Sequence, residues 1–158
     1  SKYMNTDLVW IHPSQTVNEG SLAYALNQMG IPTMVTESGA AFRIRYEYCR
    51  QIIDGIFSVM AELGIWKGKT NGKTDVPFIN EDKICYLNCE SSGLFVSYKR
   101  LKDHVKKGEI IGIIQNPLMG ATEEEVIAPV DGILMTLREH PSVTEGSLVA
   151  RVIGGGKL

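Results

Sequence analysis

The chain has 158 residues, of which 44% are hydrophobic and 22% charged, and its formal net charge is −2. This composition is typical of a globular protein and excludes a disordered tail or a collagen-like fibre. It also argues against a nucleic-acid partner, which requires a strongly basic face. The basic cluster at 99–107 is interrupted by Asp103 and favours a solvated face. No apolar run approaches the ~20 residues that span a bilayer, so we expect no membrane partner. Three cysteines favour reduced thiols in a cytoplasmic protein.

The first 64 residues predict alternating strands and helices. Residues 7–12 form an apolar run typical of a strand, and residues at helical spacing follow Ser21 and end at Gly30. Residues 33–36 predict a second buried strand, and the spacing from about 46 to 63 predicts a longer helix with one apolar stripe. This order predicts part of an α/β layer with a parallel sheet. Two strands are too few for a stable parallel sheet covered on both faces, so we expect the end of a larger α/β domain.

A polar stretch rich in Lys, Gly, Thr and Asn follows, and its composition is typical of a linker. Beyond it, short apolar runs alternate with turns that contain Gly, Pro and Asp, which predicts an all-β structure. We therefore divide the chain into an incomplete α/β segment (1–66), a linker (67–80) and a β domain of barrel or barrel-sandwich type (81–158).

The β domain contains an internal repeat. Gly93 and the turn that ends at Gly108 in the first copy correspond to Gly132 and the turn that ends at Gly146 in the second. The first pair of glycines is 39 residues apart and the second pair 38, so one residue is deleted between the copies. Each copy reads as strand, short excursion, V-x-x-G turn and strand. Two such units that close on each other make a small barrel-sandwich.

These turns, together with A-P-V-D-G at 128–132, give residues 82–153 a resemblance to the biotinyl/lipoyl-type barrel-sandwich hybrid. A swinging-arm carrier of that type needs a lysine on the hairpin that joins its two copies. Residues 115–125 contain no lysine, so we do not expect attached biotin or lipoate. Because a fold does not specify a function, a non-catalytic binding or interaction module that uses a lysine-less barrel stays open as an alternative.

Glu37 is the strongest candidate for chemistry. It directly follows the predicted strand at 33–36 and precedes a turn of small residues at 38–41. Ligand sites in open α/β sheets gather at the carboxyl ends of strands, where a carboxylate can serve as a general base for water. Position alone leaves the alternative that Glu37 is an ordinary surface residue at the end of a strand.

Three features in order resemble the C-terminal portion of the succinylglutamate desuccinylase/aspartoacylase family. They are G-I-P-T-M-V-T-E-S-G, a helix that ends L-G-I-W-K-G, and a β domain with V-x-x-G-E-I-I-G and A-P-V-D-G. The resemblance covers about 7–153 and implies a zinc-dependent amidohydrolase, related in fold to zinc carboxypeptidases, that removes acyl groups from small N-acyl amino acids. It maps the catalytic glutamate of the E-x-G segment to Glu37. In that mechanism zinc lowers the pKa of a bound water towards ~7, and the glutamate accepts its proton.

The zinc ligands of that family are an H-x-x-E pair and a later histidine, all before the E-x-G segment. The histidines of this chain, His12, His104 and His140, each lack a glutamate at the third following position. A zinc hydrolase needs three protein ligands and an open position. We therefore expect no metal site and no catalysis from this chain alone, and zinc ligands upstream in a longer natural protein in which Ser1 is a cut end.

Arg43 closely follows Glu37, and an arginine there could clamp the carboxylate of a small N-acyl substrate through two hydrogen bonds. The alternative is a surface arginine beside a helix. The sheet edge of the incomplete α/β half is exposed on this interpretation, and exposed strand edges invite partners. A homo-oligomer is therefore a natural hypothesis.

Overall fold

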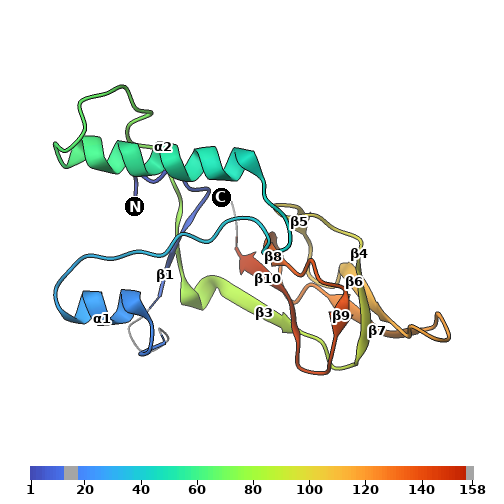
Figure 1. Ribbon diagram of the computed structural model, residues 1–158. Coiled ribbons are helices and arrows are strands. Elements are labelled where there is room, and N and C mark those ends of the chain that lie inside the picture. The colour runs from blue at the N-terminus through green and yellow to red at the C-terminus, as the bar shows by residue number, and fades with distance from the viewer. Residues whose placement is uncertain (13–17, 156–158) are drawn as a thin grey trace. The chain divides into compact units, whose positions relative to one another are not determined.

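The computed structural model describes residues 1–12 and 18–155, and the chain divides into two compact units (Figure 1). Unit 1 is Ser1–Glu81 and unit 2 is Asp82–Leu158. Unit 1 contains β1 (Val9–Ile11), α1 (Leu22–Gln28), α2 (Tyr46–Glu62) and β2 (Phe78–Asn80). After the short 3-10 helix η2 (Glu81–Lys83), unit 2 contains β3 (Ile84–Asn88), β4 (Gly93–Ser97), β5 (His104–Val105), β6 (Ile110–Gln115), β7 (Thr122–Ile127), β8 (Gly132–Leu137), β9 (Ser142–Val143) and β10 (Leu148–Gly154).

The two helices of unit 1 lie where the sequence predicts them. The Ser21 hydroxyl accepts a hydrogen bond from the backbone N–H of Tyr24 at 3.2 Å, which caps the start of α1. The residues of α2 that pack inward are Gly55 and Ser58. Ile53, Ile56 and Phe57 are exposed, whereas Ile52 and Met60 are half-buried. The described chain therefore covers the apolar stripe of α2 only in part. Among residues 1–12 and 18–155, no helix has the length and hydrophobicity needed to traverse a bilayer.

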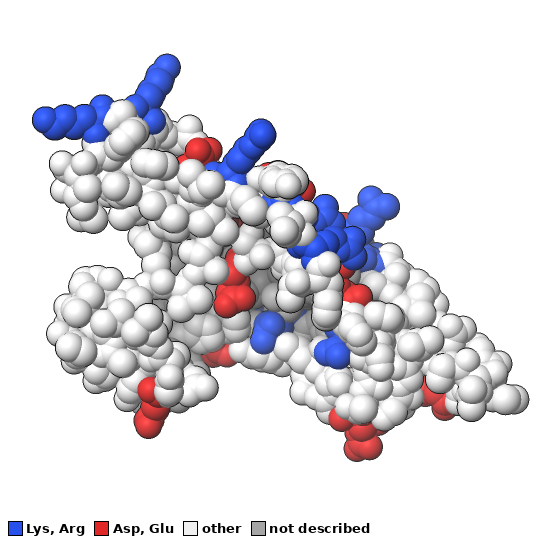
Figure 2. Space-filling view, in the orientation of Figure 1, with Lys and Arg blue, Asp and Glu red and all other residues white. Residues whose placement is uncertain are grey.

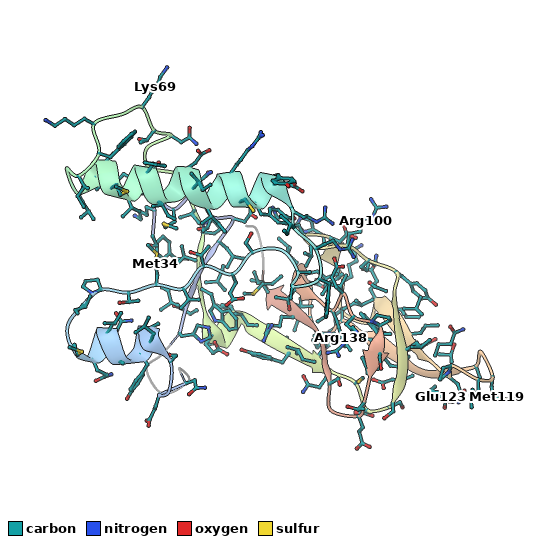
Figure 3. All side chains as sticks on the ribbon, in the orientation of Figure 1. Met34, Lys69, Arg100, Met119, Glu123 and Arg138 are labelled. Carbon is teal, nitrogen blue, oxygen red and sulfur yellow. The ribbon has the colours of Figure 1, made fainter. Side chains whose placement is uncertain are left out.

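The predicted strand at 33–36 is wrong. These residues belong to no helix or strand, and Met34 and Val35 are exposed (Figure 3). A strand needs a neighbour that accepts and donates its backbone hydrogen bonds. No described segment supplies that neighbour, so the β-type sequence of 33–36 stays without a ladder.

The partner of β1 is instead β2, which lies inside the segment that the sequence predicts as a linker. The two strands run parallel, with Val9 opposite Phe78 and Ile11 opposite Asn80. Thr74 also donates its backbone N–H to the carbonyl of Lys2 at 2.8 Å, and Val76 is buried. Residues 74–80 are therefore part of unit 1. A polar composition gave no signal for such a short strand.

Unit 2 consists of two four-stranded sheets, in the orders β3-β10-β8-β5 and β7-β6-β4-β9. The internal repeat is visible in this topology. In the first copy β4 pairs with β6, and in the second β8 pairs with β10. The short strand of each copy joins the sheet of the other copy, because β5 pairs with β8 and β9 pairs with β4. Neither copy completes a sheet without the other.

The two repeated turns have the same backbone geometry. Gly108 has φ +84 and Gly146 has φ +81, a region that side chains disfavour. The strands that follow, β6 and β10, carry much of the core, in which Ile111, Ile114, Val149 and Val152 are all fully buried. The spacing of the repeat thus predicts both the turns and the strands that enclose the core.

Candidate functional site

Glu37 lies on the exposed, extended segment between α1 and α2. The chain turns immediately after it, because Gly39 has φ +70 and Arg43 donates its backbone N–H to the carbonyl of Ala40 at 3.3 Å. The ring of Tyr48 lies against the turn, and a Cβ on Gly39 would be only 3.2 Å from Tyr48 Cδ2. Tyr48 belongs to the first turn of α2, so the N-terminal end of this helix fixes the turn that carries Glu37.

An open hollow of about 200 Å³ lies beside this turn. Its walls come from the residues directly after Glu37 and from the first turns of α2. They are Ser38, Gly39, Arg43, Ile44, Arg45, Tyr48, Cys49 and Ile52. The hollow therefore has a mainly apolar lining, and Arg43 and Arg45 are among its lining residues at the start of a helix.

The charge of this hollow favours anions. The first backbone N–H groups of a helix have no intrahelical partner, and the helix dipole adds partial positive charge there. Arg45 forms an ion pair with Glu47 whose Nη1 and Oε1 lie 3.6 Å apart, and both side chains are largely exposed. An exposed ion pair of this kind contributes little to stability.

Of the two residues that the sequence singles out, Arg43 lines the hollow and Glu37 immediately precedes its rim. The structure thus brings Arg43 to the same local feature as the Glu37 turn. It does not place the Glu37 side chain among the lining residues.

A second polar cluster lies at the carboxyl ends of the two parallel strands. Trp10 Nε1 donates a hydrogen bond to Glu81 Oε2 at 2.8 Å, and His12 Nδ1 lies 3.5 Å from the same oxygen. The rings of Trp10 and His12 are tilted by 34° to each other, with centroids 4.0 Å apart. Sequence reasoning missed Glu81, because the pairing of β1 with β2 joins residues about seventy positions apart. This cluster links the ends of the two strands.

The described residues do not supply a metal site. Nowhere among them do three His, Cys, Asp or Glu side chains gather closely enough to hold a metal ion. His104 and His140 are exposed in unit 2, and the backbone carbonyl of His140 accepts a hydrogen bond from Arg138. The described residues therefore do not fit zinc by themselves.

No protein-family model matches the sequence, and neither does any curated protein. Solved structures do match. A product-bound structure of the ectoine utilization protein EutE (DoeB) from Ruegeria pomeroyi is 22% identical, with a TM-score of 0.83. A succinylglutamate desuccinylase/aspartoacylase from Rhodobacter sphaeroides is 21% identical, with a TM-score of 0.79, and a succinylglutamate desuccinylase from Silicibacter sp. TM1040 is 22% identical, with a TM-score of 0.81.

These matches cover nearly all of this chain but less than half of each solved protein. The shares are 96% and 46% for the Ruegeria structure, 97% and 47% for the Rhodobacter structure, and 96% and 46% for the Silicibacter structure. The chain thus spans about half the length of the structures it matches, which is consistent with the C-terminal portion that the sequence predicts. The resemblance is confirmed at the level of structure: the chain has the fold of part of the succinylglutamate desuccinylase/aspartoacylase proteins.

Proposed function

We propose that this chain is part of a zinc-dependent amidohydrolase that removes the acyl group from a small N-acyl amino acid or a similar compound. The observation that carries the proposal is the structural match to desuccinylase/aspartoacylase proteins across unit 1 and unit 2 together. The hollow beside the Glu37 turn adds support, because its two arginines and its apolar floor suit a substrate that has both a carboxylate and an acyl chain.

In this proposal Glu37 is the general base that takes a proton from the attacking water, and it later returns that proton to the departing amine. Arg43 binds the substrate carboxylate through two charge-assisted hydrogen bonds. Zinc would supply a polarised carbonyl and a more acidic water. Since the described residues offer no three-ligand group, the ligands would come from residues outside this chain, and the chain alone would be inactive.

Within this assignment, unit 2 is a barrel-sandwich hybrid whose joining hairpin, at residues 115–125, carries no lysine. Its two interlocked copies favour that description. They also support the second candidate function, a non-catalytic binding module built on the same barrel. The two candidates differ in one respect, because only the hydrolase needs Glu37.

The test uses the longest natural polypeptide that contains these residues. We expect zinc in metal analysis and release of free amine from a panel of N-succinyl and N-acetyl amino acids. Glu37→Gln should lower kcat by about 10²–10⁴-fold and leave the zinc content unchanged. Glu19→Gln, which changes another exposed carboxylate of unit 1, is the control and should retain activity. Full activity of Glu37→Gln would remove Glu37 from the mechanism, and absence of both metal and hydrolysis would favour the binding module.

Arg43→Lys separates substrate binding from chemistry. A lysine keeps the charge but loses the fork geometry, so we expect a higher KM with kcat little changed. Arg50→Lys lies further along α2, outside the walls of the hollow, and serves as the matched control. An unchanged KM for Arg43→Lys would make Arg43 a surface arginine.

A further inference from the structure

The hairpin that joins β6 to β7 displays two apolar side chains to solvent. Leu118 is 91% exposed and Met119 is 80% exposed, at the end of unit 2 labelled by Met119 and Glu123 in Figure 3. This hairpin connects the two copies of the repeat and carries no lysine. Carboxylates accompany the apolar pair, because Glu123 and Glu125 are both exposed on β7. We call these four residues the acidic tip, and Figure 2 shows white atoms at its end with red atoms nearby.

The acidic tip is built by a network of hydrogen bonds. Asn116 Oδ1 accepts from the backbone N–H groups of Leu118 at 2.9 Å and Met119 at 3.0 Å. Asn116 Nδ2 donates to Glu123 Oε1 at 2.8 Å, and Gln115 Nε2 donates to the carbonyl of Gly120 at 2.9 Å. The backbone that carries the two apolar side chains is therefore fixed before any partner arrives. Pre-organisation of this kind lowers the entropic cost of binding.

A surface of opposite charge lies on the connection from β4 to β5. Tyr98 is 59% exposed and Leu101 is 50% exposed, and Arg100 and Lys102 are exposed beside them. We call these four residues the basic turn. It is also rigidly built, because Asp103 Oδ2 accepts from the backbone N–H of Arg100 at 2.8 Å. Lys102 has φ +71, which is uncommon for a residue with a side chain, and its N–H donates to the carbonyl of Leu134 at 2.9 Å.

We propose that the acidic tip of one copy of this chain docks on the basic turn of a second copy. The exposed charges beside the apolar side chains are negative on the acidic tip and positive on the basic turn, where the carboxylate of Asp103 is half-buried and accepts the N–H of Arg100. Arg100 lies away from Met119 and Glu123 within unit 2, so one copy does not cover its own tip (Figure 3). The same carboxylates disfavour contact between two acidic tips and contact with an anionic lipid surface. This inference does not depend on the proposed hydrolase activity.

The size of the contact favours a reciprocal arrangement. A stable interface buries about 800 Å² per partner, more than one hairpin end provides. In a twofold dimer each copy contributes both a tip and a turn, which doubles the contact and closes the assembly. Attraction between exposed charges weakens as salt rises, so we expect the association to be salt-sensitive.

The test is sedimentation equilibrium of the full chain from micromolar to millimolar concentration, at low and high salt. We expect a dimer that dissociates as salt increases. Leu118→Ser and Met119→Ser should each weaken association roughly tenfold or more, because each removes a large apolar contact. Met29→Ser is the matched control, since Met29 is 73% exposed at the end of α1 in unit 1. Circular dichroism should show that all these variants fold normally.

A charge exchange identifies the partner surface. Glu125→Lys and Arg100→Glu should each weaken the dimer. When the two variants are mixed, they should associate again, because the tip of the first variant and the turn of the second then carry opposite charges. The hydrogen bonds given above for the two turns do not use either side chain, so the turns should keep their shape. The proposal would be overturned if the chain were monomeric at every concentration and salt level, or if Leu118→Ser and Met119→Ser left the strength of association unchanged. A mixture that fails to associate would overturn the choice of the basic turn.

Discussion

Unit 1 and unit 2 use their apolar residues in opposite ways. Nearly all of the buried apolar residues of the described chain lie in unit 2, and only Met4 and Val76 of unit 1 join them. Most of the exposed large apolar residues lie in unit 1, including Met34, Ile53 and Leu63. Apolar burial is the main favourable term in folding. Unit 2 therefore has a core that can stabilise it, whereas unit 1 buries few apolar residues. Unit 2 is therefore a self-contained β structure, whereas unit 1 is an α/β segment with much of its apolar surface exposed.

The candidate site lies in unit 1, the unit with fewer buried apolar residues. Glu37, Arg43 and the hollow between α2 and its preceding turn all belong to unit 1. Its sheet has only two strands, and the β-type residues at 33–36 lead directly into Glu37 without joining it. The contrast between the units thus links folding to function.

The largest change in stability that tests this contrast should come from a substitution that opens a cavity in unit 2. Leu134 is fully buried, so Leu134→Ala should destabilise unit 2 by about 2–5 kcal/mol. Both tryptophans, Trp10 and Trp66, lie in unit 1, so their fluorescence during urea unfolding reports that unit alone. We expect amide NMR signals of β6 and β10 to be lost at lower urea, with the tryptophan transition unchanged.

The matched substitution in unit 1 is Leu63→Ala. Leu63 is 66% exposed at the end of α2, so its loss should change stability by less than about 0.5 kcal/mol. If Leu134→Ala moved the fluorescence and NMR transitions together, the two units would unfold as one, and the contrast drawn here would fail.

A smaller effect tests the repeat within unit 2. Gly108→Ala and Gly146→Ala each place a side chain in the left-handed region, which costs about 1–2 kcal/mol. Because the two turns are equivalent, both substitutions should have similar effects on thermal unfolding. Asparagine tolerates this conformation better than alanine, so Gly108→Asn should be less destabilising. Strongly unequal losses for the two alanine variants would show that the repeat is not equivalent in energy.

The smallest effect concerns acid stability. A hydrogen bond from Lys99, followed by one from the backbone N–H of Lys106, lowers the pKa of Glu109 from its ordinary value of 4.5. A lowered pKa in the folded state contributes stability above the ordinary value, and that contribution is lost as pH falls through the folded-state pKa. We expect unit 2 to lose stability below about pH 4.5, and Glu109→Gln to flatten this dependence. An identical acid profile for Glu109→Gln would remove this pair as its source.

The sequence predicts features that depend on nearby residues. The helix expected at 46–63 is observed as Tyr46–Glu62, and the V-x-x-G turns have the left-handed glycines that their pattern implies. Local spacing determines both, so a sequence pattern is enough.

Features that depend on distant residues were not predictable in the same way. The strand expected at 33–36 is absent because no described neighbour pairs with it, and β2 was missed because its partner β1 lies about seventy residues earlier. For the site, the pattern identified Glu37 and Arg43, but not the walls that Tyr48 and Ile52 supply from the first turns of α2. Those walls depend on how the turn packs against the helix, which no single motif encodes.

Hydrogen exchange of the full chain, followed residue by residue, tests the central claim most directly. We predict strong protection for backbone amides of β6, β8 and β10, whose neighbours pair on both sides, and rapid exchange at Met34, Val35 and Thr36. Amides of β1 should also exchange quickly, because a two-stranded sheet is only marginally stable. Equal, strong protection in unit 1, including residues 33–36, would contradict the account, since unit 1 would then be a complete structure by itself.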